Sequence, residues 1–264
     1  MAELAFARRP WIVVGWIAFA SYVVLAAMRL DFSVERLLVG IGNAKQFFGR
    51  MFPPEILQTD SMVRGLAESL EIAVLASCAG IVFSLPLGVL AARNLMPAWA
   101  SWPARTVVAL CRSFHPVIVA ILFVKAVGFG ALAGILTLTV ASVGFISKLF
   151  AEAIEEISLK QVEAVRATGA PFTSVLVYGV LPQTMSRFVG FAAYQVDSNL
   201  RNSTIVGIVG AGGIGSTLFA AFQRFDYSFV CAILIIIITV IMLGETLARM
   251  VRTILGIDAR RSDA

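Results

Sequence analysis

Asp197 and Arg201 are the ionisable residues whose spacing most directly suggests a chemical role. They are four positions apart, so they share one face of a helix and can form an ion pair. Ionisable residues within an apolar helix usually face a cavity or a charged partner. The neighbouring polar side chains that could line such a cavity are Asn199, Asn202, Ser203 and Thr204. Two interpretations stay open: a buried pair that orients its helix, or part of the lining of a pathway.

Arg112 and His115 are three positions apart and add a second pair of candidate pathway residues. His115 is the only histidine, so the chain cannot build a histidine-based metal cluster or catalytic dyad by itself. A lone histidine beside a proline is more often a hydrogen-bonding partner within a helix, and Arg112 could equally anchor near lipid headgroups. We therefore predict no catalytic residue and no metal site.

Gly210, Gly212 and Gly215 match the glycine spacing of a dinucleotide-binding loop. That loop functions only between a strand and a helix of a βαβ unit, and the chain has no such pattern. The glycines instead predict a tight turn or close backbone packing at the outer membrane face. No Gly-x-x-x-x-Gly-Lys-Ser/Thr loop is present either, so ATP would have to be handled by a partner.

The elements that position these residues are predicted to be membrane-spanning helices. The chain has 264 residues, of which 59% are hydrophobic and 14% charged, and its mean hydropathy is +0.90. Soluble domains are about 45–50% apolar and about 25% charged. Long uninterrupted apolar runs favour helices over barrel strands, which alternate. The predicted fold class is therefore an all-α, polytopic membrane protein.

We expect about six transmembrane helices, near residues 10–28, 68–91, 105–127, 130–151, 184–208 and 228–250. Pro86 and Pro116 lie inside two of these spans and should kink them. The segment after the first span mixes apolar and basic residues at helical spacing, which favours an amphipathic surface helix. The predicted division is a first span with this surface segment (1–64), a core (65–252) and a cytoplasmic tail (253–264).

The distribution of Lys and Arg predicts that both termini are cytoplasmic. With that orientation, twelve of these residues lie on the cytoplasmic side and six on the outer side. Cytoplasmic loops carry the excess of positive charge in membrane proteins. The net charge of +5 is thus explained by topology, and nothing in it suggests a nucleic-acid partner.

The most polar stretch of the second half lies between the fourth and fifth predicted spans. Ser158 followed by Gln161 has the form of a capping box, which would begin a helix. Gly169 with Pro171 just after it predicts a left-handed C-cap. These signals define a short helix over 159–168, and an ordinary surface helix between two spans would also fit them.

The residues of this stretch resemble the EAA loop of ABC importer permeases. That pattern is Glu-Ala-Ala, three residues, Gly, nine residues, Ile, one residue, Leu-Pro. The matching residues are Glu163, Ala164, Gly169, Leu181 and Pro182. Val165 replaces the second Ala, and Gly179 stands at the Ile position. The resemblance implies that this coupling helix, near 159–169, docks onto a separate ATPase subunit through Glu163, Ala164, Arg166, Thr168 and Gly169.

Three further segments are similar to phosphonate importer permeases: 112–116, 145–156 and 199–215. The resemblance implies a type I ABC importer permease in the bacterial inner membrane, with two copies forming a path for phosphonate or a related small oxyanion. The implied partners are an ABC ATP-binding subunit and an extracytoplasmic substrate-binding protein. This chain would bind no cofactor, because ATP and Mg would be held by the ATPase subunit.

Two other functions are alternatives to this one. A stand-alone secondary transporter or channel would need no docking helix. A membrane-embedded lipid phosphotransferase would need clustered acids or histidines at one membrane face, and the sequence offers no such cluster.

Overall fold

The computed structural model describes residues 10–30, 33–56 and 59–254. Every regular element within these ranges is a helix, and no strand occurs there. The chain divides into two compact units, residues 1–52 and 53–264. Residues 255–264 of the predicted cytoplasmic tail lie outside the described residues, as does the basic pair Arg8 and Arg9 near the N-terminus.

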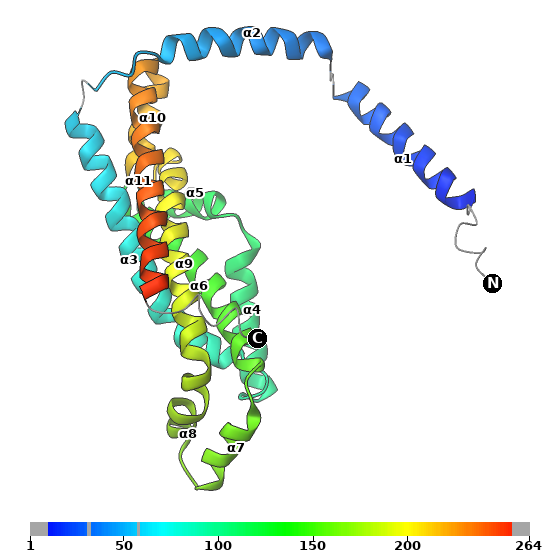
Figure 1. Ribbon diagram of the computed structural model, residues 1–264, viewed down its shortest axis with the longest axis vertical. Coiled ribbons are helices and arrows are strands. Elements are labelled where there is room, and N and C mark those ends of the chain that lie inside the picture. Colours follow the sequence, from blue (N-terminus) through cyan, green and yellow to red (C-terminus); the bar gives the residue numbers. More distant parts are fainter. Residues whose placement is uncertain (1–9, 31–32, 57–58, 255–264) are drawn as a thin grey trace. The chain divides into compact units, whose positions relative to one another are not determined.

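The first unit contains α1 (Pro10–Arg29) and α2 (Val34–Met51) (Figure 1). The large apolar side chains of α1 are exposed, from Trp11 to Met28, as expected for a helix whose solvent is lipid. Ser33 caps the start of α2, where its hydroxyl accepts a hydrogen bond from the Arg36 amide at 3.2 Å. The segment predicted to be an amphipathic surface helix is thus helical, and its charged residues, Glu35, Arg36, Lys45 and Arg50, lie among apolar ones.

The second unit holds all the candidate site residues. Its elements are α3 (Thr59–Ala91), α4 (Ala98–Ser113), α5 (Pro116–Val127), α6 (Ala131–Glu155), α7 (Leu159–Ala167), α8 (Phe172–Ser174), the π-helix η1 (Val175–Val180), α9 (Leu181–Ile208), α10 (Ile214–Gln223) and α11 (Tyr227–Ile254). Figure 1 shows α3, α6, α9 and α11 side by side along the long direction of this unit. Helices α7 and α8 form one end of it, and α10 lies toward the other end.

Four described helices are long and apolar enough to cross a membrane, namely α1, α3, α6 and α11. The pair α4 and α5 would make a fifth span, although the two helices are bent by 93°. The all-α, polytopic architecture is therefore confirmed. Helix α9 has 28 residues and corresponds to the predicted span 184–208, but it is not among these long apolar helices.

The third predicted span, 105–127, is wrong as a single helix. Phe114 and His115 leave helical geometry, and Pro116 starts α5 as its first residue. Proline suits this position because the first amides of a helix have no intrahelical partner. Pro86, in contrast, lies within the continuous helix α3.

The core of this unit is built where α3 packs against α6. Small residues line the α3 face, and a Cβ on Gly80 would overlap the Ser142 side chain. A Cβ on Gly88 would lie 2.7 Å from Cδ1 of Phe150, a ring that is fully buried. Small residues let membrane helices approach closely and gain van der Waals contact, which replaces the hydrophobic effect in lipid. This contact fixes the frame on which α9 and α7 are placed.

Candidate functional site

Helix α7, the predicted coupling helix, is attached to the unit by a single buried side chain. Val162 is 1% exposed and packs in a cluster with Ile154, Val175 and Val180. The other α7 residues are exposed except Val165, which is partly buried against the same cluster. The five predicted ATPase-coupling residues, Glu163, Ala164, Arg166, Thr168 and Gly169, are all exposed. The helix thus presents a free surface at one end of the unit (Figure 1).

The start of α7 differs from the predicted capping box. Ser158 is the N-cap residue, but its side chain makes no capping hydrogen bond. The amide of Ser158 instead donates to Oε1 of Gln183 at 3.1 Å. Gln183 lies in the first turn of α9, and its Nε2 also donates to the Gly179 carbonyl at 2.6 Å. A side chain 25 positions away therefore accepts the capping hydrogen bond that was predicted for Gln161.

The end of α7 agrees with the prediction. Gly169 has φ +74°, a conformation that costs little only for glycine, and its amide donates to the Arg166 carbonyl at 3.0 Å. Nothing lies within 4 Å of the position that a Cβ on Gly169 would take. The glycine is needed for the backbone turn and not for space.

Gly179, which departs from the family pattern, has a packing role. It is buried in η1, and a Cβ there would lie 3.3 Å from the Cα of Val162. That distance is shorter than side chains normally accept from a backbone atom, so α7 would have to move. The glycine lets α7 lie directly against the helix that leads into α9.

Asn199 is fully buried at the centre of a polar cluster that joins α3, α6 and α9. Its Nδ2 donates to Oγ of Ser77 at 2.9 Å and to Oγ of Ser142 at 2.8 Å. Nε2 of Gln195 donates to Oδ1 of Asn199 at 3.0 Å and to the same Ser142 oxygen at 3.1 Å. Ser203, one turn further along α9, is also buried and donates to the Leu200 carbonyl at 2.8 Å.

Asp197 and Arg201 form the predicted ion pair, with Nη2 and Oδ2 2.8 Å apart. Arg201 also binds Glu245 of α11, where Nη1 and Oε1 are 2.6 Å apart. The second oxygen of Asp197, Oδ1, is buried and has no hydrogen-bond partner among the described residues. Arg201 therefore links α9 to α11, a contact that the helical spacing alone did not reveal.

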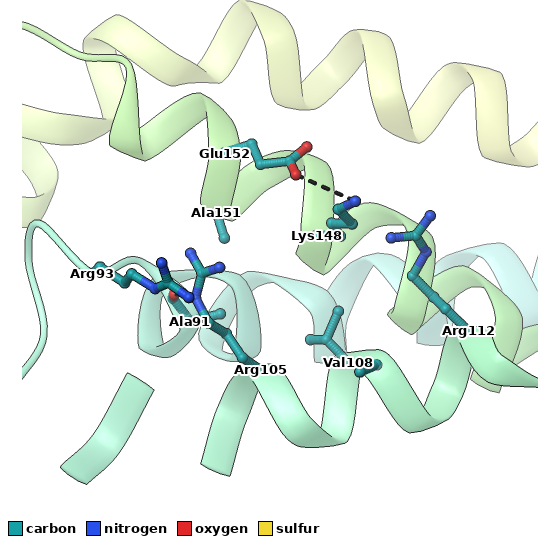
Figure 2. Close-up of a pocket in the computed structure, with 9 residues that line it drawn as sticks. Ala91, Arg93, Arg105, Val108, Arg112, Lys148, Ala151 and Glu152 are labelled. Atoms are coloured by element: carbon teal, nitrogen blue, oxygen red, sulfur yellow. Dashed lines mark hydrogen bonds and ion pairs between the residues drawn. The ribbon is translucent and has the colours of Figure 1, made fainter. Parts of the chain in front are cut away.

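Asn202 and Thr204 lie on α9 beside these groups and are partly buried. Nδ2 of Asn202 donates to Oγ of Ser198 at 3.3 Å, within the same helix. Arg112 and His115 lie elsewhere, at the break between α4 and α5. Nδ1 of His115 accepts from the Val117 amide at 3.3 Å and caps α5, and Arg112 lines a pocket with Lys148 (Figure 2).

The glycine-rich segment is a tight turn, as predicted. Gly210, Gly212 and Gly213 have positive φ, and a Cβ on Gly215 would overlap the Thr204 carbonyl. The backbone of α10 thus packs directly on that of α9. Across the described ranges, no three His, Cys, Asp or Glu side chains come together to hold a metal ion.

Sequence reasoning missed four of the residues that organise this site: Ser77, Ser142, Gln183 and Gln195. Each is a polar residue within or beside a span. Gln195 and Asn199 are four apart, so their shared helix face was readable from the sequence. The partner serines were not, because their pairing depends on how three helices pack.

Apolar helices of spanning length, polar groups buried between helices and an exposed helix at one end are the arrangement expected of a membrane transport permease. The comparisons with known proteins agree. A family model described as "binding-protein-dependent transport system inner membrane component" matches residues 84–256. The chain belongs to this family, the permease components of binding-protein-dependent ABC importers.

Several proteins of similar sequence are named as phosphonate or phosphite permeases. The chain is 38% identical over 247 residues to the phosphite transport system permease protein PtxC of Stutzerimonas stutzeri, which covers 92% of this chain and 89% of that protein. It is 41% identical over 209 residues to the phosphate-import permease protein PhnE of Mycolicibacterium smegmatis. That match covers 78% of this chain and only 39% of the mycobacterial protein.

Solved structures support the same assignment. An inward-facing methionine ABC transporter, MetNI, aligns with a TM-score of 0.63 and 26% identity, covering 73% of this chain and 95% of that chain. A bacterial alginate ABC transporter aligns with a TM-score of 0.58 over 92% of this chain and 99% of that chain. The identity there is 16%, so this second likeness shows the fold alone.

Proposed function

We propose that two copies of this chain form the translocation path for phosphonate or a related small oxyanion, and that α7 of each copy docks onto a separate ATPase subunit. A substrate-binding protein outside the membrane delivers the anion. ATP and Mg are held by the ATPase subunit, and this chain is non-catalytic. The names of the relatives, which include phosphate, phosphite and phosphonate permeases, support this substrate class.

The exposure of α7 is the observation that carries the coupling proposal. The helix offers its coupling residues to a partner while Val162 holds it to the unit. Gln183 and Gly179 connect α7 to the start of α9 by hydrogen bonds and close packing. A displacement of α7 would therefore be passed to α9, the helix that carries the polar residues.

The partly exposed polar residues of α9 are the proposed lining of the path. Arg201 can attract an oxyanion, but its charge is already shared by two carboxylates, Asp197 and Glu245. Such a site holds an anion weakly, and weak binding suits transport because a tightly bound substrate would not leave. Asn202 and Thr204 add hydrogen-bonding groups, while the buried Asn199 and Ser203 hold α9 in place.

The test of the proposal is co-purification of the ATPase subunit with a C-terminally tagged chain. The two are co-expressed, extracted in mild detergent and analysed by mass spectrometry. Gly169→Asp is compared with the native chain, because a side chain at φ +74° strains the end of α7 and adds a negative charge to its exposed surface. We expect the ATPase subunit with the native chain and its loss with the variant.

Gly128→Asp is the matched control. Gly128 also has positive φ (94°) and open space around the position of a Cβ, but it ends α5 and not α7. We expect this variant to retain the ATPase subunit. If the chain purifies alone in its native form, or if both variants behave alike, α7 is not the docking helix and a stand-alone transporter becomes the better explanation.

A further inference from the structure

The α7 end of the second unit contains a basic pocket of about 320 Å³. It lies where the end of α3 meets α4 and α6. Its lining residues are Ala91, Arg93, Arg105, Val108, Ala109, Arg112, Lys148, Ala151 and Glu152. On α4 the lining residues stand at i, i+3, i+4 and i+7, and on α6 at i, i+3 and i+4, so each helix turns one face to the pocket.

The charge of this pocket is strongly positive. Four of its side chains are cationic and one is acidic, and Glu155 adds a second carboxylate through its ion pair with Arg105. Lys148 is paired with Glu152 at 3.4 Å, but both side chains are almost half exposed, so this pair is weak. No ion pair or hydrogen bond to another described residue is made by the side chains of Arg93 and Arg112.

Two of the cations are held in place. Arg105 donates from Nε to the Ala91 carbonyl at 2.8 Å and pairs with Glu155, which also accepts from the Arg93 amide at 2.8 Å. The aliphatic stem of Arg112 lies against Gly144 of α6. A Cβ added to Gly144 would lie 2.8 Å from Cγ of Arg112. Figure 2 shows Arg93 and Arg105 beside each other at one end of the pocket and Arg112 at the other.

We propose that this pocket binds a phosphate-type oxyanion, either the headgroup of an anionic phospholipid or free inorganic phosphate. Arginine side chains bind such anions through pairs of parallel, charge-assisted hydrogen bonds. The pocket volume far exceeds the share of about 30 Å³ that one water takes in the liquid, so an oxyanion fits with some of its water. Val108 and Ala151 give the pocket an apolar floor, which strengthens these charge interactions.

The bound oxyanion would join three helices. Arg93 follows α3, Arg112 lies in the last turn of α4, and Lys148 lies on α6, so an oxyanion held in this pocket with its water would connect cations of three helices. Basic pockets between membrane helices on the cytoplasmic side are known to bind anionic headgroups as a general property. The site is separate from the polar residues of α9 and does not depend on the substrate proposed above.

The experiment measures both sources of the anion on the purified full-length chain with its co-purifying subunits. One arm titrates inorganic phosphate into lipid-depleted protein and measures binding by calorimetry, with chloride as the competing salt. The other arm reconstitutes the protein in nanodiscs of mixed phosphatidylglycerol and phosphatidylcholine, and counts retained lipids by native mass spectrometry. Phosphate binding identifies the free anion, and selective retention of phosphatidylglycerol identifies the headgroup.

Arg112→Gln combined with Lys148→Gln should weaken whichever binding is found by at least about tenfold. Lys125→Gln combined with Arg224→Gln removes the same charge from other exposed positions and should leave it unchanged. Glu152→Gln should tighten binding several-fold, because it frees Lys148, and a merely damaged fold could not produce that gain. Absence of both kinds of binding, or equal binding by the Arg112/Lys148 variant, would overturn the proposal.

Discussion

At the scale of single residues, Asn199 is a polar side chain that links three helices. It is fully buried and connects α9 to one serine of α3 and one of α6. The hydrocarbon core offers no water to replace a lost partner, so buried polar groups there must satisfy one another. The same residue that the sequence singled out as a pathway candidate therefore also joins three helices.

Asn199→Ala should lower the free energy of unfolding by about 1–3 kcal/mol, since it leaves Gln195 and two serines short of partners. The measurement is thermal unfolding of the purified protein in detergent. Asn202→Ala is the control, because that side chain bonds only within its own helix. Equal losses in the two variants would mean that the cluster does not hold the helices together.

Arg201 is shared by Asp197 and Glu245, and this sharing predicts non-additive substitutions. Asp197→Asn or Glu245→Gln alone leaves Arg201 one carboxylate, whereas the double variant leaves neither. The double variant should therefore lose about 0.5–3 kcal/mol of unfolding free energy beyond the sum of the single losses. A double-mutant cycle measures this coupling, and simple additivity would show that the two contacts are independent.

At the scale of elements, the connection between α7 and α9 is the part that most affects the proposed mechanism. Gln183→Ala removes the side chain that bonds both Ser158 and Gly179, and should cost about 0.5–2 kcal/mol of stability, as other lost helix caps do. Gln161→Ala should cost almost nothing, because Gln161 is exposed and caps no helix. Thermal unfolding of both variants decides between the predicted capping box and the cap that the structure contains.

These elements show how far the sequence could be interpreted. The spacing of apolar runs predicted the long spans, and Gly169 with Pro171 predicted where α7 ends, because both signals are local. The sequence predicted a kink at Pro116, whereas the structure has a break between α4 and α5. The sequence could not separate the two, because a proline can interrupt a span or begin a new helix. The Gln183 cap and the Ser77–Ser142–Asn199 contacts join residues far apart in the chain, and only packing brings them together.

At the scale of the whole molecule, orientation in the membrane is a prediction from the distribution of Lys and Arg. The α7 end of the second unit should face the cytoplasm, and the end with α10 should face outward. A cysteine introduced at Lys160 or at Arg224 tests this, after Cys78, Cys111 and Cys231 are replaced by serine. In intact cells, an impermeant maleimide should label the cysteine at 224 and reach that at 160 only after permeabilisation; the reverse pattern would invert the topology.

The proposed function requires that an ATPase subunit drive the transport of a small oxyanion by this chain. Its most direct test is uptake of a radiolabelled alkylphosphonate into proteoliposomes that contain the chain, its ATPase subunit and the substrate-binding protein. We predict accumulation with Mg-ATP, and none when ATP, the ATPase subunit or the binding protein is left out. Uptake by the chain alone, driven by an ion gradient, would contradict the account and identify a secondary transporter.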